Sequence, residues 1–506
     1  MQNPFTDPRP RGYFVGAFIL ILVGVVMGLG VGAGLDASRA PAGTTAAVAA
    51  SSSAAALAVP ESPFVSVVEK TLPAVVFIDV KKTVSGGDSG DPQEEMLRRF
   101  FGHDDNGNGR PRTTPSSGSG FIIDTEGHIL TNNHVVRDAS DITVTLNDHR
   151  TYKAKVVGTD PETDVAVIKI AGDHLPVLPL GDSDQLRVGD WAIAIGNPLG
   201  QLRGSVTVGI VSAQGRTDLN IWGGTPTFQD FIQTDASINF GNSGGPLCNI
   251  HGEAIGINTA INTSGQGIGF AIPINLAKHV ADQLLASGKV QRAWLGIQLA
   301  ELTPELAEGF GLAAVQQGIL VQNVLPGTPA DRAGLRRNDV IVEFNGQPVL
   351  DVPKFRLKVA DTRIGSKVPL VVLRDGKRVP VDVLLTERPK DGGVAQNGDD
   401  NGNDNGGGAV GQAHSTLGGL QVRDLTTEEK RAAKIESGVA ITDVEEGSAA
   451  EDAGLQPGDI IQQLGGKPVT SATGFAKQLK DAKVKHAALL VISNGTPRFV
   501  ALQLAE

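Results

Sequence analysis

The residue best suited to nucleophilic chemistry is Ser243, which lies in the run Gly-Asn-Ser-Gly-Gly at 241–245. Glycines around a serine let the backbone turn tightly and let hydrogen-bond donors approach a reacting carbonyl group. The run alone is ambiguous, because it also satisfies the nucleophile-elbow pattern of α/β-hydrolases, and a glycine–serine turn without any chemistry is commoner than either. The presence and chain order of residues that could activate the serine distinguish these interpretations.

Two upstream residues have the chemistry to activate this serine. His134 follows the strand-like run 127–130, and Asp164 opens the apolar run 164–170. Each alone has an ordinary explanation, since a histidine is usually a polar surface or core group and an aspartate before a strand is usually a turn former. Together they give the chain order His, Asp, Ser, which is trypsin-like, whereas α/β-hydrolases place the serine first and alternate strands with helices. The sequence therefore predicts a catalytic triad of His134, Asp164 and Ser243.

This triad would work by acyl transfer. His134 would take the proton of the Ser243 hydroxyl, while Asp164 would hold the imidazole tautomer and stabilise the imidazolium. The backbone N–H groups of Gly241 and Ser243 would receive the developing oxyanion. We therefore expect Gly241, Asn242 and Ser243 to form the oxyanion hole and part of the substrate-binding site.

The elements that must position these residues are short β-strands. Between residues 63 and 286, short apolar runs rich in Val, Ile and Leu alternate with turns of Gly, Asp and Asn. The chain holds 64 glycines and 28 prolines and only 4% aromatic residues, which favours short strands and turns over long helices. We expect a mainly β protein with β-barrels in this region. A polar stretch at 86–118 interrupts the strands, either as a working loop or as a disordered insertion.

The C-terminal half contains an internal repeat, because residues 318–349 match residues 438–469. Both copies place an Ala-Gly-Leu turn between two apolar runs and end in Gly-x-Pro-Val. Between the copies, residues 391–412 are almost wholly Gly, Asn, Asp, Ala and Val, which cannot form a core. We therefore expect two repeated domains joined by a flexible linker at 389–415.

Four runs resemble the HtrA family, also called the Deg or Do proteases: Thr-Asn-Asn-His-Val-Val at 131–136, and the runs 164–170, 233–239 and 241–247. The resemblance covers about residues 63–506. It implies a trypsin-like double β-barrel protease domain followed by two α+β PDZ domains, at 63–286, 290–388 and 416–506. It also implies a trimer or larger homo-oligomer that degrades, and sometimes holds, unfolded envelope proteins without ATP. The loop 86–118 resembles the segment through which this family couples neighbouring active sites.

The resemblance also places a substrate pocket near Ile238 and residues 257–262, which are apolar and uncharged. We therefore expect cleavage after small aliphatic residues such as Val, Ala or Ile. Phe240 departs from the family, which commonly has Pro or Arg before the nucleophile turn, and this change could alter the approach to the pocket.

A PDZ domain binds the free carboxylate of a peptide in a glycine-containing loop, and the peptide adds as a strand beside a helix. The resemblance assigns this role to Leu295, Gly296 and Ile297 in the first repeat and to Gly419 and Leu420 in the second. Unfolded proteins and C-terminal peptides are the expected partners. The alternative for the second repeat is a structural cap without a ligand, because Gly-Gly makes a looser loop than Leu-Gly-Ile.

The N-terminus has the features of an export signal. Arg9 and Arg11 precede an uncharged run at 12–35, about 24 residues long, which as a helix of roughly 36 Å could span a bilayer. Basic residues before such a run stay in the cytoplasm, so the remaining chain would be periplasmic. The apolar run is longer than that of a signal peptide, although the following Ala-rich sequence could accept a signal peptidase. We expect residues 1–36 to be an inner-membrane signal-anchor or a cleaved signal peptide, and residues 37–62 to be an Ala/Ser/Pro-rich linker.

Several partner and cofactor classes are disfavoured. The net charge of −11 argues against binding of nucleic acid. Cys248 is the single cysteine, so the chain can form neither an intrachain disulfide nor a cysteine cluster for zinc. No Gly-x4-Gly-Lys-Ser/Thr phosphate loop occurs, which is consistent with independence from ATP, and no metal or organic cofactor is expected. Two other functions stay open: a holdase chaperone in which Ser243 is dispensable, and a membrane-anchored signalling protease that cuts one regulator.

Overall fold

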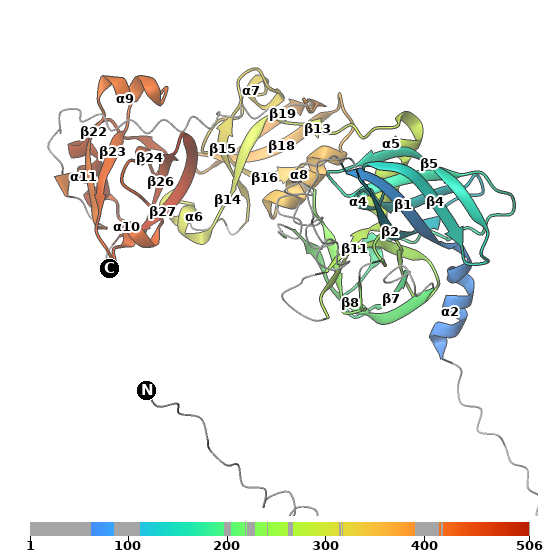
Figure 1. The fold of residues 1–506 in the computed structure, drawn as a ribbon. Coiled ribbons are helices and arrows are strands. Elements are labelled where there is room, and N and C mark those ends of the chain that lie inside the picture. The colour runs from blue at the N-terminus through green and yellow to red at the C-terminus, as the bar shows by residue number, and fades with distance from the viewer. Residues whose placement is uncertain are drawn as a thin grey trace, which may run out of the picture. The chain divides into compact units, whose positions relative to one another are not determined.

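The fold is described from a computed structural model of the chain, which divides into two units, Met1–Glu61 and Ser62–Glu506 (Figure 1). The described residues all belong to the second unit: 62–84, 112–196, 204–217, 219, 228–239, 241–261, 267–312, 315, 317–389, 414–415 and 418–504. The predicted membrane span or signal peptide, most of the Ala-rich linker, Phe240 and most of the linker at 389–415 lie outside the described residues. From Ser62 onward, no described helix is long and apolar enough to cross a membrane.

Two closed six-stranded barrels follow the short helix α2 (Pro63–Thr71) and the turn η1 (Leu72–Ala74). The first has the strand order β1-β2-β3-β6-β5-β4. Its strands are β1 (Val75–Val84), β2 (Arg112–Ile122), β3 (His128–Asn132), β4 (Ala139–Leu146), β5 (Thr151–Asp160) and β6 (Val165–Ile170), and the short helix α4 (Asn133–Val136) follows β3. Apolar side chains that alternate along these strands, such as Ile78, Ile122 and Ile168, fill the barrel.

The second barrel has the strand order β10-β11-β12-β9-β8-β7. Its strands are β7 (Trp191–Gly196), β8 (Ser205–Arg216), β9 (Phe231–Thr234), β10 (Pro246–Cys248), β11 (Ala254–Ile261) and β12 (Gly269–Pro273), and the turn η2 (Ser183–Gln185) precedes them. The helix α5 (Ile274–Ser287) ends at Gly288, whose φ of 72° gives the left-handed cap that glycine adopts without strain. This helix packs against β5, β6, β11 and β12 (Figure 1).

The two barrels share one apolar core. Phe121 and Val165 of the first barrel are fully buried in the same cluster as Ile193 and Ile257 of the second. Leu284 of α5 is also fully buried there. Because the core is common to both barrels, residues at their junction are held in fixed relative positions. The expectation of a mainly β protein with a double barrel is confirmed.

The loop expected at 86–118 was predicted too long. Residues from Arg112 onward belong to β2 and pair with β1, from Val84 opposite Arg112 to Val75 opposite Phe121. The long strand β1 offers a continuous backbone edge, so the end of the polar stretch adopts strand structure despite its composition. Residues 85–111 of the predicted loop lie outside the described part of the chain.

The first repeat is a sheet of order β14-β15-β16-β18-β19, with β17 paired to β16 and a separate β13–β20 ribbon. Its elements are β13 (Ala293–Trp294), β14 (Ile297–Glu301), α6 (Pro304–Gly309), β15 (Ile319–Val324), α7 (Pro329–Arg332), β16 (Val340–Phe344), β17 (Gln347–Pro348), α8 (Val352–Asp361), β18 (Lys367–Arg374), β19 (Lys377–Leu384) and β20 (Thr386–Glu387). Strand β14 stands at the end of the sheet, and no strand among the described residues pairs with its outer edge.

The second repeat has the order β21-β22-β23-β24-β26-β27, with β25 paired to β24. Its elements are β21 (His414–Ser415), β22 (Leu420–Asp424), α9 (Thr427–Ala432), β23 (Val439–Val444), α10 (Ala449–Asp452), β24 (Ile460–Leu464), β25 (Lys467–Pro468), α11 (Ala472–Asp481), β26 (His486–Ser493) and β27 (Thr496–Gln503). Strand β22 corresponds to β14 of the first repeat. Its outer edge is paired antiparallel with β21, which also contacts α11.

Candidate active site

His134 lies on α4, the single helical turn after β3. Its neighbours Val135 and Val136 are buried in the first barrel and anchor this turn. The carbonyl of His134 accepts a hydrogen bond of 2.9 Å from the Nζ of Lys82, a residue only 8% exposed. A carbonyl group near the C-terminal end of a helix accepts no hydrogen bond from within the helix. The ammonium group of Lys82 supplies this hydrogen bond, and its positive charge also suits the negative end of the helix dipole.

Asp164 fixes the orientation of the His134 ring. Its Oδ2 lies 2.7 Å from the Nδ1 of His134, and its Oδ1 accepts the His134 backbone N–H at 2.9 Å. The Oδ2 also accepts the hydroxyl of Thr259 at 2.8 Å. Only 7% of the Asp164 side chain and 14% of the His134 side chain are exposed. A carboxylate only accepts, so the Nδ1 of His134 carries the proton and the Nε2 is left as the basic nitrogen.

The backbone of Asp164 is held in a rare conformation. Its φ is 59°, in the left-handed region that costs free energy for a residue with a side chain. Two hydrogen bonds to its carbonyl group offset this cost, from the N–H of Asn133 at 3.1 Å and from the Nδ2 of Asn132 at 3.0 Å. Strain of this kind persists where the surrounding structure fixes it, and it is frequent at functional sites.

Ser243 lies in the turn between β9 and β10, on the side of the second barrel that meets the first. Its hydroxyl donates to the carbonyl of Thr259 at 3.3 Å. Thr259 therefore contacts both Asp164, through its hydroxyl, and Ser243, through its carbonyl. A Cβ atom on Gly118 would lie 2.7 Å from the side chain of Val135 and 3.3 Å from the carbonyl of Ser243. The three predicted residues therefore come together at the junction of the barrels.

The turn around Ser243 needs glycine at two positions. Gly241 has a φ of 98° and Gly244 a φ of 84°. A Cβ atom on Gly244 would also lie 2.2 Å from the carbonyl oxygen of Ser119, which no side chain could tolerate. The N–H of Asn242 donates to Asn239 at 3.0 Å. Within the described residues, the N–H groups of Gly241 and Ser243 donate no hydrogen bond, so both are available to a ligand oxygen.

The predicted pocket residues are not all apolar, since Asn258 and Thr259 lie among them, and those whose side chains are described are buried. Ile238 is 5% exposed and packs in a small cluster of the second barrel, while Ile257 is fully buried in the shared core. The amide of Asn258 donates to the carbonyls of Ile195 and Pro246, so this residue stabilises the barrel. Asn262, the last residue of the predicted pocket, lies outside the described residues.

The carboxylate-binding loops predicted for the two repeats have the same backbone conformation at one glycine. Gly296 and Gly419 have φ values of 79° and 82°. A Cβ atom at either position would lie within 2.3 Å of a side chain, that of Thr328 in the first repeat and that of Ser448 in the second. Leu295 and Leu420 beside these glycines are buried, and Ile297 is half-buried on β14. The repeats differ at the strand that follows the loop: no described strand pairs with the outer edge of β14, whereas Gln421 and Val422 of β22 pair with β21.

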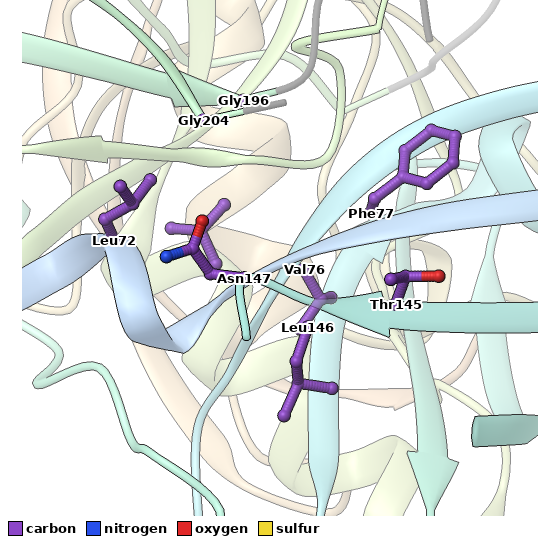
Figure 2. Close-up of a pocket in the computed structure, with 9 residues that line it drawn as sticks. Leu72, Val76, Phe77, Thr145, Leu146, Asn147, Gly196 and Gly204 are labelled. Carbon is purple, nitrogen blue, oxygen red and sulfur yellow. The ribbon is translucent and has the colours of Figure 1, made fainter. Parts of the chain in front are cut away.

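Cys248 and a small pocket near the first barrel have no groups suited to catalysis. Burial raises the pKa of the Cys248 thiol to about 12, so its thiolate form is absent at neutral pH. A small pocket beside β1 is lined by Leu72, Val75, Val76, Phe77, Thr145, Leu146, Asn147, Gly196 and Gly204 (Figure 2). None of these side chains is an acid or a base. No group of His, Cys, Asp and Glu side chains that could hold a metal ion occurs among the described residues.

Lys82 and Ser119 were not predicted from the sequence, and Thr259 was predicted only as part of the substrate pocket at 257–262 and not as a partner of Asp164. Ser119 is fully buried, and its hydroxyl donates to the carbonyl of Gly241 at 2.6 Å. The sequence offers a weak signal for Ser119, which stands between two glycines at 118–120. It offers none for Lys82 or for the contact of Thr259 with Asp164, because both are strand residues whose partners lie far away along the chain.

Comparisons with known proteins agree with this description. Residues 118–257 match the trypsin-like peptidase domain family, and residues 293–385 and 440–492 each match a PDZ domain family. The double barrel, the site at its junction and the two repeats thus define a trypsin-like serine peptidase with two PDZ domains.

Close relatives cover most of the chain. A protein of Pseudomonas putida named "Probable periplasmic serine endoprotease DegP-like" is 42% identical over 460 residues, 88% of this chain and 93% of the relative. One of the same name from Chlamydia trachomatis is 42% identical over 425 residues, 82% of this chain and 80% of the relative. The solved structure of the HtrA-type protease AlgW with a decapeptide is 45% identical with a TM-score of 0.52, and covers 64% of this chain and 99% of AlgW. The chain belongs to the HtrA-type, DegP-like family of serine endoproteases.

Proposed function

We propose that this protein hydrolyses peptide bonds of unfolded envelope proteins without ATP, with His134, Asp164 and Ser243 as its catalytic triad. The proposal rests on one observation. The carboxylate of Asp164 accepts hydrogen bonds from the backbone N–H and from the Nδ1 of His134, and Thr259 links Asp164 to Ser243. Membership of a serine endoprotease family supports the reaction type.

The mechanism follows from the proton positions. The basic Nε2 of His134 takes the Ser243 proton as the Oγ attacks the peptide carbonyl carbon, and Asp164 stabilises the imidazolium that forms. The oxyanion accepts hydrogen bonds from the N–H groups of Gly241 and Ser243, beside Asn242. The imidazolium then protonates the leaving amine, and the C–N bond breaks. In the second half of the reaction His134 removes a proton from water, whose oxygen attacks the carbonyl carbon of the acyl-enzyme, and the imidazolium then gives this proton to the Oγ of Ser243 as the ester C–O bond breaks.

The substrate preference is proposed from the apolar surroundings of the site. Ile238 and the neighbouring residues of β11 present no charge that would select Lys or Arg. We expect the scissile bond to follow Val, Ala or Ile. Sequencing of the fragments from an unfolded protein tests this preference, and a preponderance of cuts after Lys or Arg would contradict it.

The first PDZ domain is proposed to bind C-terminal peptides. The loop of Leu295, Gly296 and Ile297 presents backbone N–H groups for a carboxylate, and the open edge of β14 can accept a peptide strand beside α8. The related AlgW has been solved with a decapeptide and with a tripeptide, which supports peptide recognition in this family. For the second domain, the pairing of β21 with the corresponding edge favours the role of a structural cap over peptide binding at Gly419 and Leu420.

The protein is proposed to act in the periplasm as a homotrimer or a multiple of it. The relatives are named periplasmic, and the apolar run at 12–35 suits an anchor or an export signal. An exposed apolar surface supports the assembly. Trp191 is 49% exposed and Val188 is 65% exposed, and the ring centroids of Trp191 and Phe64 lie 5.1 Å apart. Light scattering of Trp191→Lys beside the wild type tests this; an unchanged trimer would exclude this surface as the interface.

Digestion of a permanently unfolded protein tests the proposed activity. We expect the purified protein to degrade reduced casein without ATP and to leave a stable folded protein intact. Suppression of aggregation by a protein that cuts neither substrate would instead support a holdase. Cleavage of one regulator but not of casein would support a signalling protease.

A further inference from the structure

The contacts of Ser119 single it out among the buried residues near the active site. Ser119 lies on β2 of the first barrel, yet two of its polar groups bond the nucleophile turn of the second barrel. Its hydroxyl donates to the carbonyl of Gly241 at 2.6 Å, and its backbone N–H donates to the carbonyl of Ser243 at 2.9 Å. Its own carbonyl accepts the hydroxyl of Thr131 on β3 at 2.7 Å. One serine thus connects the wall of one barrel to both carbonyls that flank Asn242.

These bonds fix the peptide planes on either side of an oxyanion donor. The plane between Gly241 and Asn242 is held at its carbonyl by Ser119 and at its N–H by Asn239. The plane after Ser243 is held at its carbonyl by Ser119 and at the next N–H by Asn258, at 2.8 Å. The peptide plane that carries the N–H of Ser243 lies between these two, and the carbonyl of Asn242 in this plane accepts the N–H of Gly245 at 2.9 Å, so all three planes of the turn are fixed by hydrogen bonds.

The same contacts bear on the second donor. The N–H of Gly241 belongs to the residue whose carbonyl accepts the Ser119 hydroxyl, and the φ of Gly241 is 98°. Glycine has little intrinsic preference for one backbone conformation, so the direction of this N–H depends on partners outside the residue. The hydroxyl of Ser119 is such a partner, buried and directed at the adjacent carbonyl.

We propose that Ser119 is a positioning residue for the oxyanion hole, which aligns the N–H groups of Gly241 and Ser243 for the transition state. The inference rests on the proposed function, because it assigns Ser119 a part in the reaction of Ser243. Ser119 does not touch the substrate. It acts through the turn, and it should therefore change the stabilisation of the oxyanion and leave ground-state binding of the peptide unaltered.

The expected size follows from the value of an oxyanion donor. Loss of one donor costs on the order of 10²- to 10³-fold in kcat. The Ser119→Ala variant keeps its backbone N–H and loses only the hydroxyl, so the turn keeps one of its two bonds to β2. We expect kcat to fall about 10- to 100-fold, roughly 1.4 to 2.7 kcal/mol in barrier height, with KM changed less than about threefold.

The test measures kcat, KM and the inhibition constant of a peptidyl boronic acid for four variants of the full chain. The boronate forms a tetrahedral adduct whose oxygen occupies the oxyanion hole, so its affinity should fall in proportion to kcat/KM in Ser119→Ala. Thr131→Val, which frees the carbonyl of Ser119, should lower kcat about three- to tenfold. The control is Ser140→Ala, because the Ser140 hydroxyl also bonds a carbonyl, that of Lys81 at 2.8 Å, but at an exposed site. Ser243→Ala supplies the inactive reference.

Each outcome decides the matter. A kcat of Ser119→Ala within threefold of the wild type, or a loss carried by KM with boronate affinity unchanged, would overturn the inference. If Ser119→Ala fails to fold, as judged by its thermal transition, Thr131→Val decides, and an unaltered kcat in that variant would overturn the inference. Activity of Ser243→Ala equal to the wild type would instead remove the proposed function, which distinguishes the two failures.

Discussion

Replacement of Asp164 by asparagine should separate the catalytic role of this residue from its structural role. The Oδ2 of Asp164 faces two donors, the Nδ1 of His134 at 2.7 Å and the Thr259 hydroxyl at 2.8 Å, and the Oδ1 faces the His134 N–H. An amide offers one acceptor oxygen in place of two. With its oxygen on the His134 N–H, the amide NH2 group would point at the imidazole. The ring must then accept at Nδ1 and carry its proton on Nε2, where it cannot act as a base toward Ser243.

The magnitude follows from this exchange of tautomers. In the trypsin-like arrangement such a change lowers kcat on the order of 10⁴-fold, about 5.4 kcal/mol in barrier height. The effect on the free energy of unfolding should be far smaller, about 1 to 2 kcal/mol, since the shape of the side chain is kept. Thr259→Val removes only one of the donors to Asp164 and should cost about tenfold in kcat.

Steady-state hydrolysis of a fluorogenic peptide, with thermal unfolding of the same samples, measures both quantities. An Asp164→Asn variant that keeps kcat within tenfold of the wild type would refute the assignment of Asp164. An equal loss of kcat in Asp164→Asn and Thr259→Val would show that kcat depends on the packing around Asp164 and not on its charge.

Three further predictions concern the stability of the chain and its peptide binding. Asp160→Asn should leave the buried Arg292 guanidinium with only the carboxylate of Glu162, 3.0 Å away, and cost roughly 2 kcal/mol, because the side chains of Asp160 and Arg292 are 5% and 10% exposed; calorimetry should show the melting temperature of the protease domain lowered by roughly 4 to 8 °C, and an unchanged value would contradict this. In the second PDZ domain, Arg423 lowers the pKa of Glu429 from 4.5 to about 2, so the ion pair stabilises the fold above pH 4.5 and this contribution is lost as the pH falls toward 2. The side chain of Glu429 is about a third exposed, so the contribution is about 1 kcal/mol. When the free energy of unfolding is measured by denaturant at several acidic pH values, it should fall less steeply with decreasing pH in Glu429→Gln than in the wild type. An equally steep fall in the variant would argue against this role of the ion pair. Titration calorimetry should find one C-terminal peptide bound per chain, lost in Gly296→Val, because β21 covers the corresponding edge of the second domain; two sites per chain would show that β21 is displaced.

The proposed triad could be identified in the sequence because each of its members carries a local signal. Ser243 stands among glycines, His134 follows a strand and Asp164 opens one, and their chain order excludes the α/β-hydrolase arrangement. Thr259 and Ser119 carry little signal of this kind. Thr259 bonds a residue 95 positions away and Ser119 one 122 positions away, and such contacts exist only after the two barrels have packed together.

The repeated domains show the same limit. The repeat itself is visible in the sequence because both copies share their turns and apolar runs. The difference between their binding edges is not visible, because β21 comes from a stretch whose composition indicates only a linker, and its strand structure depends on the backbone of β22. For the same reason the end of the loop at 86–118 was missed, since residues from Arg112 form a strand only beside β1.

Reaction of the wild-type protein with a fluorophosphonate, followed by peptide mass spectrometry, tests most directly whether Ser243 is the nucleophile. The triad assignment requires a single adduct on the peptide that contains Ser243, and no adduct there in the His134→Ala variant at the same protein and reagent concentrations. An adduct on another serine, or an unlabelled Ser243 in a preparation that degrades casein, would contradict it.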